Sequence, residues 1–158
     1  MNVDFITAIK MYFANYANFK GRSTRAEYWW AMLFLFLVGC ATSFVSQTLC
    51  SVVSLIFIVP SLAILTRRLH DIGRSGWWVL AFYAFVFVGF GILLATLGSA
   101  FLNAESDPVA AANAITNNIG YVSLSYVVML VGAIWMLVWC VKKSGPDNQY
   151  GPNPYGEE

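Results

Sequence analysis

The chain has 158 residues, of which 59% are hydrophobic and only 11% are charged. A soluble domain carries about 25% charged residues, so this composition indicates a protein whose surface is covered largely by lipid. Nine Lys and Arg residues balance eight Asp and Glu residues, which excludes a strongly basic nucleic-acid-binding domain, and the high hydrophobic content excludes an intrinsically disordered chain.

Residues 1–27 are predicted to form an amphipathic segment at the cytoplasmic membrane surface. This segment contains several charges and no long apolar stretch, so we expect no cleaved signal peptide. Apolar residues recur in it at three- and four-residue steps, which is the spacing of one face of a helix. We expect that helix to lie along the inner interface with this face toward the lipid. The face consists of Val3, Ile6, Ile9, Phe13, Tyr16 and Ala17.

The next 39 residues, 28–66, contain no charged residue. One straight helix of this length would reach about twice the ~30 Å thickness of the hydrocarbon core, so the segment must fold back on itself. Polar residues between Thr42 and Ser51 interrupt the apolar sequence and predict a tight hairpin. With two further apolar stretches of about 20 residues, the predicted transmembrane helices are 28–46, 49–66, 77–97 and 121–141.

The distribution of basic residues predicts the orientation of these four helices. With both termini in the cytoplasm, all nine Lys and Arg residues lie on the cytoplasmic side, as the positive-inside rule requires. The long outer segment, 98–120, contains Glu105 and Asp107 and no basic residue. The tail, 142–158, is rich in Gly, Pro and Asn and is predicted to be irregular and cytoplasmic.

The outer segment is also expected to contain a short helix. Asp107 and Pro108 resemble an N-cap and a first-turn residue, and the helix is expected to continue to Ile115 before Asn117, Asn118 and Gly120 end it. The predicted fold class is therefore an all-α polytopic membrane protein. We expect a single domain, 1–158, in which four transmembrane helices form a bundle and the N-terminal amphipathic helix is added at the interface.

Three polar motifs remain after the transmembrane helices are assigned, and all three fall on the predicted cytoplasmic face. They are residues 19–30, 67–78 and 145–154. Through them the chain resembles the bacterial YhaH-like inner-membrane family, which is catalogued as domain of unknown function 805. The resemblance implies a small multi-pass protein of the bacterial inner membrane and brings no established reaction, cofactor or catalytic residue. It rests on Gly21–Arg22, Arg25, Glu27, Trp29, the whole segment 67–78, Asn148, Tyr150–Gly151 and Pro154.

Much of the middle motif has a purely structural interpretation. Arg67 and Arg68 are expected to end the second helix, Gly73 permits a turn, and Ser75 is placed to cap the third helix, which Trp77 and Trp78 anchor at the interface. That interpretation does not explain His70 and Asp71, which are expected in a short loop between arginines. Arg25 and Glu27 are expected at the same depth.

The functional hypothesis is an anion site on the cytoplasmic face. Three arginines and the free backbone N–H groups at the start of the third transmembrane helix could converge on a lipid headgroup or another phosphate. The third motif is expected either to form a simple turn-rich tail or to fold back so that Asn148 and Tyr150 hydrogen-bond the arginine loop. The candidate residues are Arg22, Arg25, Glu27, Arg67, Arg68, His70, Asp71, Arg74, Ser75, Asn148 and Tyr150.

We also considered other classes of function. An enzyme would use His70 as a general base oriented by Asp71 or Glu27, but the sequence places no obvious nucleophile beside it. A proton-coupled transporter is disfavoured because no Asp, Glu, His, Lys or Arg lies inside the four predicted helices. Gly89 and Gly91 are expected to ease helix packing, with a dimer contact as the alternative.

We therefore favour a non-enzymatic membrane module that binds anionic phospholipid or a partner protein. A small transporter and a membrane enzyme acting on a phosphate-bearing substrate are the alternatives. One histidine and scattered carboxylates do not supply the usual ligands of a metal site, so no metal or other cofactor is expected. Nucleic acid is not expected as a partner, and a homo-oligomer or a complex with another membrane protein is left open.

Overall fold

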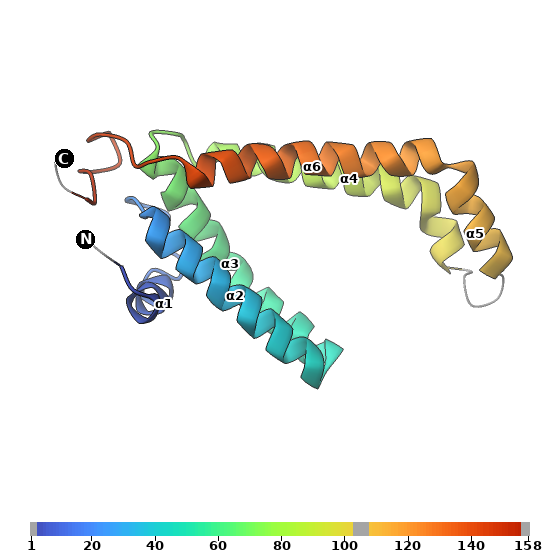
Figure 1. The fold of residues 1–158 in the computed structure, drawn as a ribbon, viewed down its shortest axis with the longest axis horizontal. Helices are drawn as coiled ribbons and strands as arrows, with labels where there is room; N and C mark the ends of the chain where they lie inside the picture. The colour runs from blue at the N-terminus through green and yellow to red at the C-terminus, as the bar shows by residue number, and fades with distance from the viewer. Residues whose placement is uncertain (1–2, 103–107, 156–158) are drawn as a thin grey trace. The chain divides into compact units, whose positions relative to one another are not determined.

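The computed structural model describes residues 3–102 and 108–155, and these residues form six α-helices. Four of the helices are long and apolar enough to cross a membrane by length and composition. The chain is thus an all-α polytopic membrane protein, as the sequence predicts. In chain order (Figure 1) the helices are α1 (Phe5–Ala14), α2 (Arg25–Val45), α3 (Gln47–Asp71), α4 (Trp77–Leu102), α5 (Pro108–Asn117) and α6 (Ile119–Val141).

Internal contacts divide the chain into two compact units. Unit 1 comprises Met1–Val79 and Trp139–Glu158, and it therefore contains α1, α2, α3 and the last turn of α6. Unit 2 comprises Leu80–Val138, which includes most of α4 and α6 and all of α5. The expectations of a single domain and of one bundle of all four long helices stay predictions.

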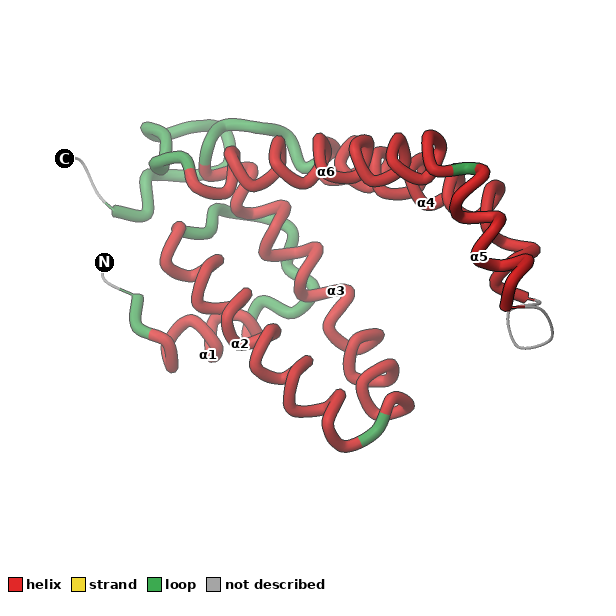
Figure 2. Tube along the Cα trace, turned by 45° about the vertical axis from the view of Figure 1, so that its right-hand side comes forward, coloured by secondary structure: helices red, strands yellow, loops and turns green. Residues whose placement is uncertain are grey.

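The predicted hairpin between the first two transmembrane helices is confirmed. Only Ser46 separates α2 from α3, and its extended backbone, with φ −166° and ψ 138°, breaks the helix. The two helices lie side by side in both views (Figures 1 and 2). The neighbouring hydroxyl groups of Thr42 and Ser51 donate to carbonyl groups one turn earlier in their own helices, so these polar side chains need no external partner.

Helix α3 is longer than predicted, and this corrects the expected position of His70 and Asp71. Both residues lie in the last turn of α3 and not in a loop. The helix ends in a Schellman motif, in which Gly73 N–H donates to the His70 carbonyl at 3.0 Å and Arg74 N–H to the Leu69 carbonyl at 2.9 Å. Gly73 has φ +74°, a left-handed conformation that favours glycine.

Helix α1 forms as predicted, and it buries a second face against the rest of the protein. Ala8 and Tyr12 are fully buried, whereas Ile6 of the predicted apolar face is 62% exposed and Phe13 is 44% exposed. Tyr12 packs in a core cluster that also contains residues of α2 and α3, and its hydroxyl lies 3.0 Å from Ser61 Oγ. Hydropathy alone misses this face because alanine allows close helix approach and tyrosine combines an apolar ring with a polar end. Placement of α1 at the membrane interface stays a prediction.

The short helix expected after the third transmembrane segment is α5. It begins at Pro108 and ends at Asn117, while its expected N-cap, Asp107, lies outside the described residues. Asn118 alone separates α5 from α6, and its side-chain amide donates to the Ala114 carbonyl at 2.9 Å. The expectation that Gly120 helps to end α5 is wrong, because Gly120 lies within α6.

Within unit 2, α4 and α6 lie side by side (Figures 1 and 2). Two glycines allow their close approach. A Cβ atom on Gly89 would lie 2.4 Å from Met129 Cγ and 2.8 Å from the Ser125 carbonyl oxygen. A Cβ atom on Gly132 would lie 2.7 Å from Phe85 Cβ. The predicted packing role is confirmed for Gly89 but not for Gly91, around which nothing among the described residues lies within 4 Å of a Cβ position.

The substitution Gly89→Ala should therefore destabilise the α4–α6 contact by about 1–3 kcal/mol, since neither α6 backbone nor Met129 can be displaced freely. Gly91→Ala is the matched control, because it places the same methyl group in the same helix and meets open space. Its free energy of unfolding should be unchanged or slightly higher, since Ala favours helix. Thermal unfolding of both variants in detergent checks this, and an equal loss of stability would contradict the packing contact.

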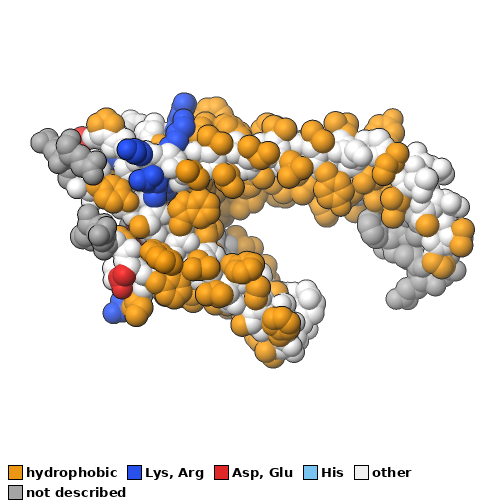
Figure 3. Space-filling view, in the orientation of Figure 1, with side chains coloured by type: hydrophobic (Ala, Val, Ile, Leu, Met, Phe, Trp, Pro, Cys, Tyr) orange, Lys and Arg blue, Asp and Glu red, His pale blue; other side chains and the backbone are white. Residues whose placement is uncertain are grey.

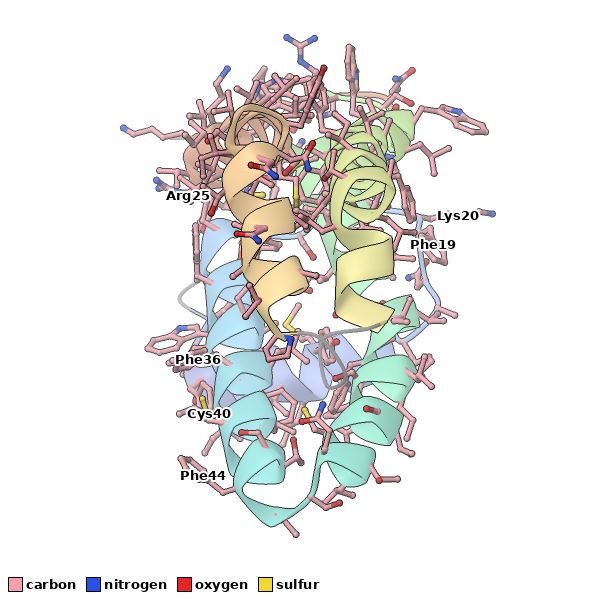
Figure 4. The ribbon with its side chains drawn as sticks, turned by 90° about the vertical axis from the view of Figure 1, so that its right-hand side faces the viewer. Phe19, Lys20, Arg25, Phe36, Cys40 and Phe44 are labelled. Atoms are coloured by element: carbon pink, nitrogen blue, oxygen red, sulfur yellow. The ribbon has the colours of Figure 1, made fainter. Side chains whose placement is uncertain are left out.

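The long helices present an apolar surface suited to lipid. Phe36 and Phe44 are 66% and 90% exposed, and together with Cys40 they follow one side of α2 that points away from α3 (Figure 4). In the face drawn in Figure 3, hydrophobic side chains cover the helices, while Lys and Arg side chains gather near the start of α2 and the end of α6. Such segregation is the expected result of burying the middle of each helix in lipid.

Candidate functional site

A buried carboxylate forms the centre of the site. Asp71, in the last turn of α3, is fully buried and accepts hydrogen bonds from three side chains. Arg22 Nε donates to Oδ1 at 3.0 Å, Arg68 Nη1 donates to Oδ2, and Ser144 Oγ donates to Oδ2 at 2.5 Å. A buried charge needs this kind of pairing, because transfer from water costs several kcal/mol per ion. Asp71 thus links three segments that are distant in the sequence.

Arg68 uses all three of its side-chain nitrogens within the protein. Besides the pair with Asp71, Nε donates to the Cys140 carbonyl at 3.1 Å and Nη2 donates to the Lys142 carbonyl. Carbonyl groups at the C-terminal end of a helix have no partner within that helix. Arg68 therefore caps the end of α6 while neutralising Asp71, and its side chain is fully buried.

Arg22 ties the tail to the end of α3. Its Nη1 donates to the Pro146 carbonyl at 2.9 Å and to the Gly151 carbonyl at 3.1 Å. Its Nη2 donates to the Gly145 carbonyl at 2.6 Å and to the Asp71 carbonyl at 3.1 Å. The planar arginine fork suits this role, since it presents five N–H donors in fixed directions.

A second buried ion pair joins α2 to α3. Arg67 Nη1 donates to Glu27 Oε1 at 3.0 Å, and both side chains are nearly inaccessible to solvent. Glu27 also lies in the first turn of α2, where its backbone N–H donates to Thr24 Oγ1 at 3.1 Å. Its negative charge there interacts favourably with the positive end of the helix dipole. Within the described residues, Arg67 Nε, Arg67 Nη2 and Ser23 Oγ are buried without a hydrogen-bond partner.

The third motif folds onto the end of α3, which agrees with the second of the two expectations for the tail. Asn148 Nδ2 donates to the His70 carbonyl at 3.0 Å, as expected. Tyr150 also contacts His70, but by ring stacking and not by the expected hydrogen bond. The ring centroids are 3.7 Å apart and the ring planes differ by 2°. The tail turns back at Gly151, which exchanges two backbone hydrogen bonds with Asn148.

The His70 ring is held by two contacts, a hydrogen bond at its edge and the stacked Tyr150 ring on its face. Its Nδ1 lies 3.2 Å from the Gly21 carbonyl oxygen, which can only accept, so Nδ1 carries a proton. The side chain is almost buried, with 8% of the residue exposed. These contacts give His70 the role of joining the first motif to the tail.

The structure brings eight of the eleven predicted site residues together around the last turns of α3, in a group that we call the polar cluster. The other three lie outside it. Arg74 is exposed and lies over the Trp139 ring, 5.1 Å from its centroid. Ser75 Oγ accepts a long hydrogen bond, 3.4 Å, from the backbone N–H of Trp77, the first residue of α4. The cluster consists of Arg22, Glu27, Arg67, Arg68, His70, Asp71, Asn148 and Tyr150.

Arg25, the third predicted residue outside the cluster, lies beside a small polar pocket. The pocket has a volume of about 190 Å³ and is lined by Arg25, Lys143, Ser144, Asn153 and Tyr155. Arg25 belongs to the first turn of α2 (Figure 4). Sequence analysis does not identify the other four residues. Lys143 is already explained by the positive-inside rule, and the tail has no sequence pattern that predicts its folded path.

The fold and the polar cluster define a small polytopic membrane protein whose helix ends are joined by buried arginine–carboxylate pairs. The chain belongs to the family described as protein of unknown function (DUF805), whose model matches residues 16–110. This match includes the first two motifs and ends before the third. No solved structure matches the chain.

Two curated relatives are similar over half of the chain. Inner membrane protein YhaI of Escherichia coli (strain K12) is 37% identical over 87 residues, which cover 51% of this chain and 73% of that protein. Inner membrane protein YhaH of the same strain is 33% identical over 91 residues, which cover 51% of this chain and 74% of that protein. Neither name states a reaction or a ligand.

Proposed function

We propose that the protein is a non-enzymatic module of the bacterial inner membrane that binds anionic phospholipid at its cytoplasmic face. The inner-membrane location is supported by the names of the relatives YhaI and YhaH. The cytoplasmic position of the polar cluster and of both termini is supported by the concentration of all nine basic residues in the segments that four crossings place on one side.

The observation that carries the proposal is the division of the basic residues into two groups. Arg22, Arg67 and Arg68 are used in internal ion pairs with two carboxylates. Among the described residues, the remaining six form no ion pair, and all are exposed except the half-buried Arg25. These six are Lys10, Lys20, Arg25, Arg74, Lys142 and Lys143.

An excess of accessible positive charge at a membrane surface attracts anionic headgroups, by about 1 kcal/mol per Lys or Arg. In the same unit the exposed carboxylates among the described residues are Asp4 and Asp147, and the tail sequence adds Glu157 and Glu158, so the six basic residues still outnumber the four acidic ones. The internal arginines hold the helix ends and the tail in place, and the accessible ones supply the binding surface.

Native mass spectrometry tests the proposal. The protein is purified in mild detergent with equal amounts of phosphatidylglycerol and phosphatidylethanolamine, and we expect preferential retention of the anionic phosphatidylglycerol. The preference should fall with added salt, because salt screens accessible charges. Equal retention of both lipids, or co-purification of a stoichiometric protein partner without retained lipid, would contradict lipid binding.

A control experiment tests the orientation of the chain in the membrane. A reporter fused after Glu158 should report the cytoplasm and a reporter inserted near Ala112 the opposite side. Both reporters on one side would remove the shared cytoplasmic face on which the proposal depends.

A further inference from the structure

We propose that the pocket between the start of α2 and the C-terminal tail is a binding site for a single phosphate group. This inference rests on the proposed function and deepens it, since it replaces a diffuse basic surface with one defined site. The lining residues are Arg25, Lys143, Ser144, Asn153 and Tyr155.

The composition of the lining favours an anion. Two cationic side chains, Arg25 and Lys143, contribute to a pocket of five residues that contains no carboxylate. Asp147, the acidic residue in the part of the tail that the structure describes, accepts a hydrogen bond from the Asn153 backbone N–H at 2.7 Å, so it is engaged by the tail itself. An arginine fork beside an ammonium group matches the oxygen atoms and the charge of a phosphate.

The neutral residues of the pocket are oriented by the fold. Asn153 Oδ1 accepts a hydrogen bond from the Tyr155 backbone N–H at 3.1 Å, which fixes the orientation of this side chain. Ser144 donates its hydroxyl proton to Asp71 and so fixes this wall of the pocket to the polar cluster. The site is therefore preorganised by the same buried ion pairs that hold the helix ends.

The size of the pocket limits the ligand. Its volume of about 190 Å³ is below the roughly 300–1,000 Å³ of sites that enclose a drug-sized molecule. A phosphate group fits this space, whereas a whole nucleotide or a whole lipid would extend outside it. The phosphate can be part of a lipid headgroup or be free in solution, and the experiment distinguishes these sources.

The test uses the full chain in phosphatidylcholine nanodiscs, with phosphatidylglycerol added in one arm and inorganic phosphate in the other. The double variant Arg25→Gln/Lys143→Gln should lose about tenfold or more in apparent affinity for the probe that binds. The comparison variant, Lys10→Gln/Lys20→Gln, removes the same charge from exposed positions of the basic surface outside the pocket, and it should lose clearly less affinity than the pocket variant. Pocket-dependent binding of phosphatidylglycerol identifies a lipid headgroup, and pocket-dependent binding of inorganic phosphate identifies a free phosphate.

A second variant keeps the test decisive if the double variant does not fold. Asn153→Asp preserves the side-chain oxygen that accepts from Tyr155 but places a negative charge in the pocket. It should abolish phosphate binding while the unfolding temperature stays close to that of the wild type. If both double variants lose phosphatidylglycerol equally, the diffuse surface is retained and the pocket is overturned. If the wild type prefers no anionic lipid and binds no phosphate, the proposed function fails as well.

Discussion

Asp71→Asn is expected to give the largest loss of stability of any single substitution in the polar cluster. It removes the negative charge that neutralises both Arg22 and Arg68, and it leaves two arginines buried without a carboxylate. Removal of one partner from a buried ion pair costs about 3–5 kcal/mol, so a residue that serves two pairs should cost at least about 5 kcal/mol. Thermal unfolding in detergent measures the loss.

The structure also predicts where the Asp71→Asn variant should open. The tail is held by hydrogen bonds from Arg22 to Gly145, Pro146 and Gly151, so a displaced Arg22 should release it. Limited trypsin digestion should then cleave after Lys143 at a higher rate than in the wild type. Tail release without any loss of helix would show that the ion pairs act locally at the helix ends.

Asp147→Asn is the control for this experiment. Asp147 is exposed and its side chain accepts one backbone hydrogen bond, which an asparagine oxygen can also accept. The same chemical change should therefore alter the free energy of unfolding by less than about 0.5 kcal/mol. Comparable losses in both variants would show that general surface charge, and not the buried pairs, stabilises this end of the protein.

The second large loss of stability is expected for Arg68→Lys. Arg68 donates from Nε, Nη1 and Nη2 to three different acceptors. A lysine ammonium on a flexible chain can reach the Asp71 carboxylate or the end of α6, but it cannot reproduce the fork. Since a hydrogen bond from a charged donor contributes about 1.5–3 kcal/mol, Arg68→Lys should cost about 3–5 kcal/mol.

Arg67→Lys is the matched comparison, because Arg67 makes one hydrogen bond, from Nη1 to Glu27, that an ammonium can also make. Its variant should lose less than about 1 kcal/mol, and lysine would also remove the buried Arg67 nitrogens that have no partner in the described structure. Unfolding midpoints of the two variants should therefore differ by roughly 10 °C. Equal midpoints would contradict the structural role of the Arg68 fork.

The transmembrane helices and the fold class were predictable from sequence because they depend on local properties. A run of 39 uncharged residues interrupted by polar ones near Ser46 requires two helices and a hairpin in a bilayer of fixed thickness. The observed transmembrane helices are longer than the predicted ones, and at α3 the reason is that charged residues continue the helix. Hydropathy ended the second transmembrane helix at residue 66, whereas α3 continues to Asp71.

The amphipathic periodicity of residues 3–17 predicted α1 but not its buried face. Tyr12 and Ala8 are buried because they fit against helices that come later in the chain. Shape at a contact depends on both partners, and one helix carries information about only one of them. Gly89 and Gly91 show the same limit, because they are chemically identical and only Gly89 lies against α6.

The candidate site shows most clearly what the sequence by itself determined. It indicated that the arginines, His70, Asp71 and the tail motif lie at one membrane edge, because charge distribution and helix length fix depth. It could not distinguish Arg67 from Arg68, since neighbouring residues of a helix point about 100° apart toward different partners. The acceptors of Arg68 include a carbonyl 72 positions further along the chain. Only the tertiary structure decided which arginines are neutralised inside the protein and which stay accessible, because burial and pairing depend on segments that meet only after folding.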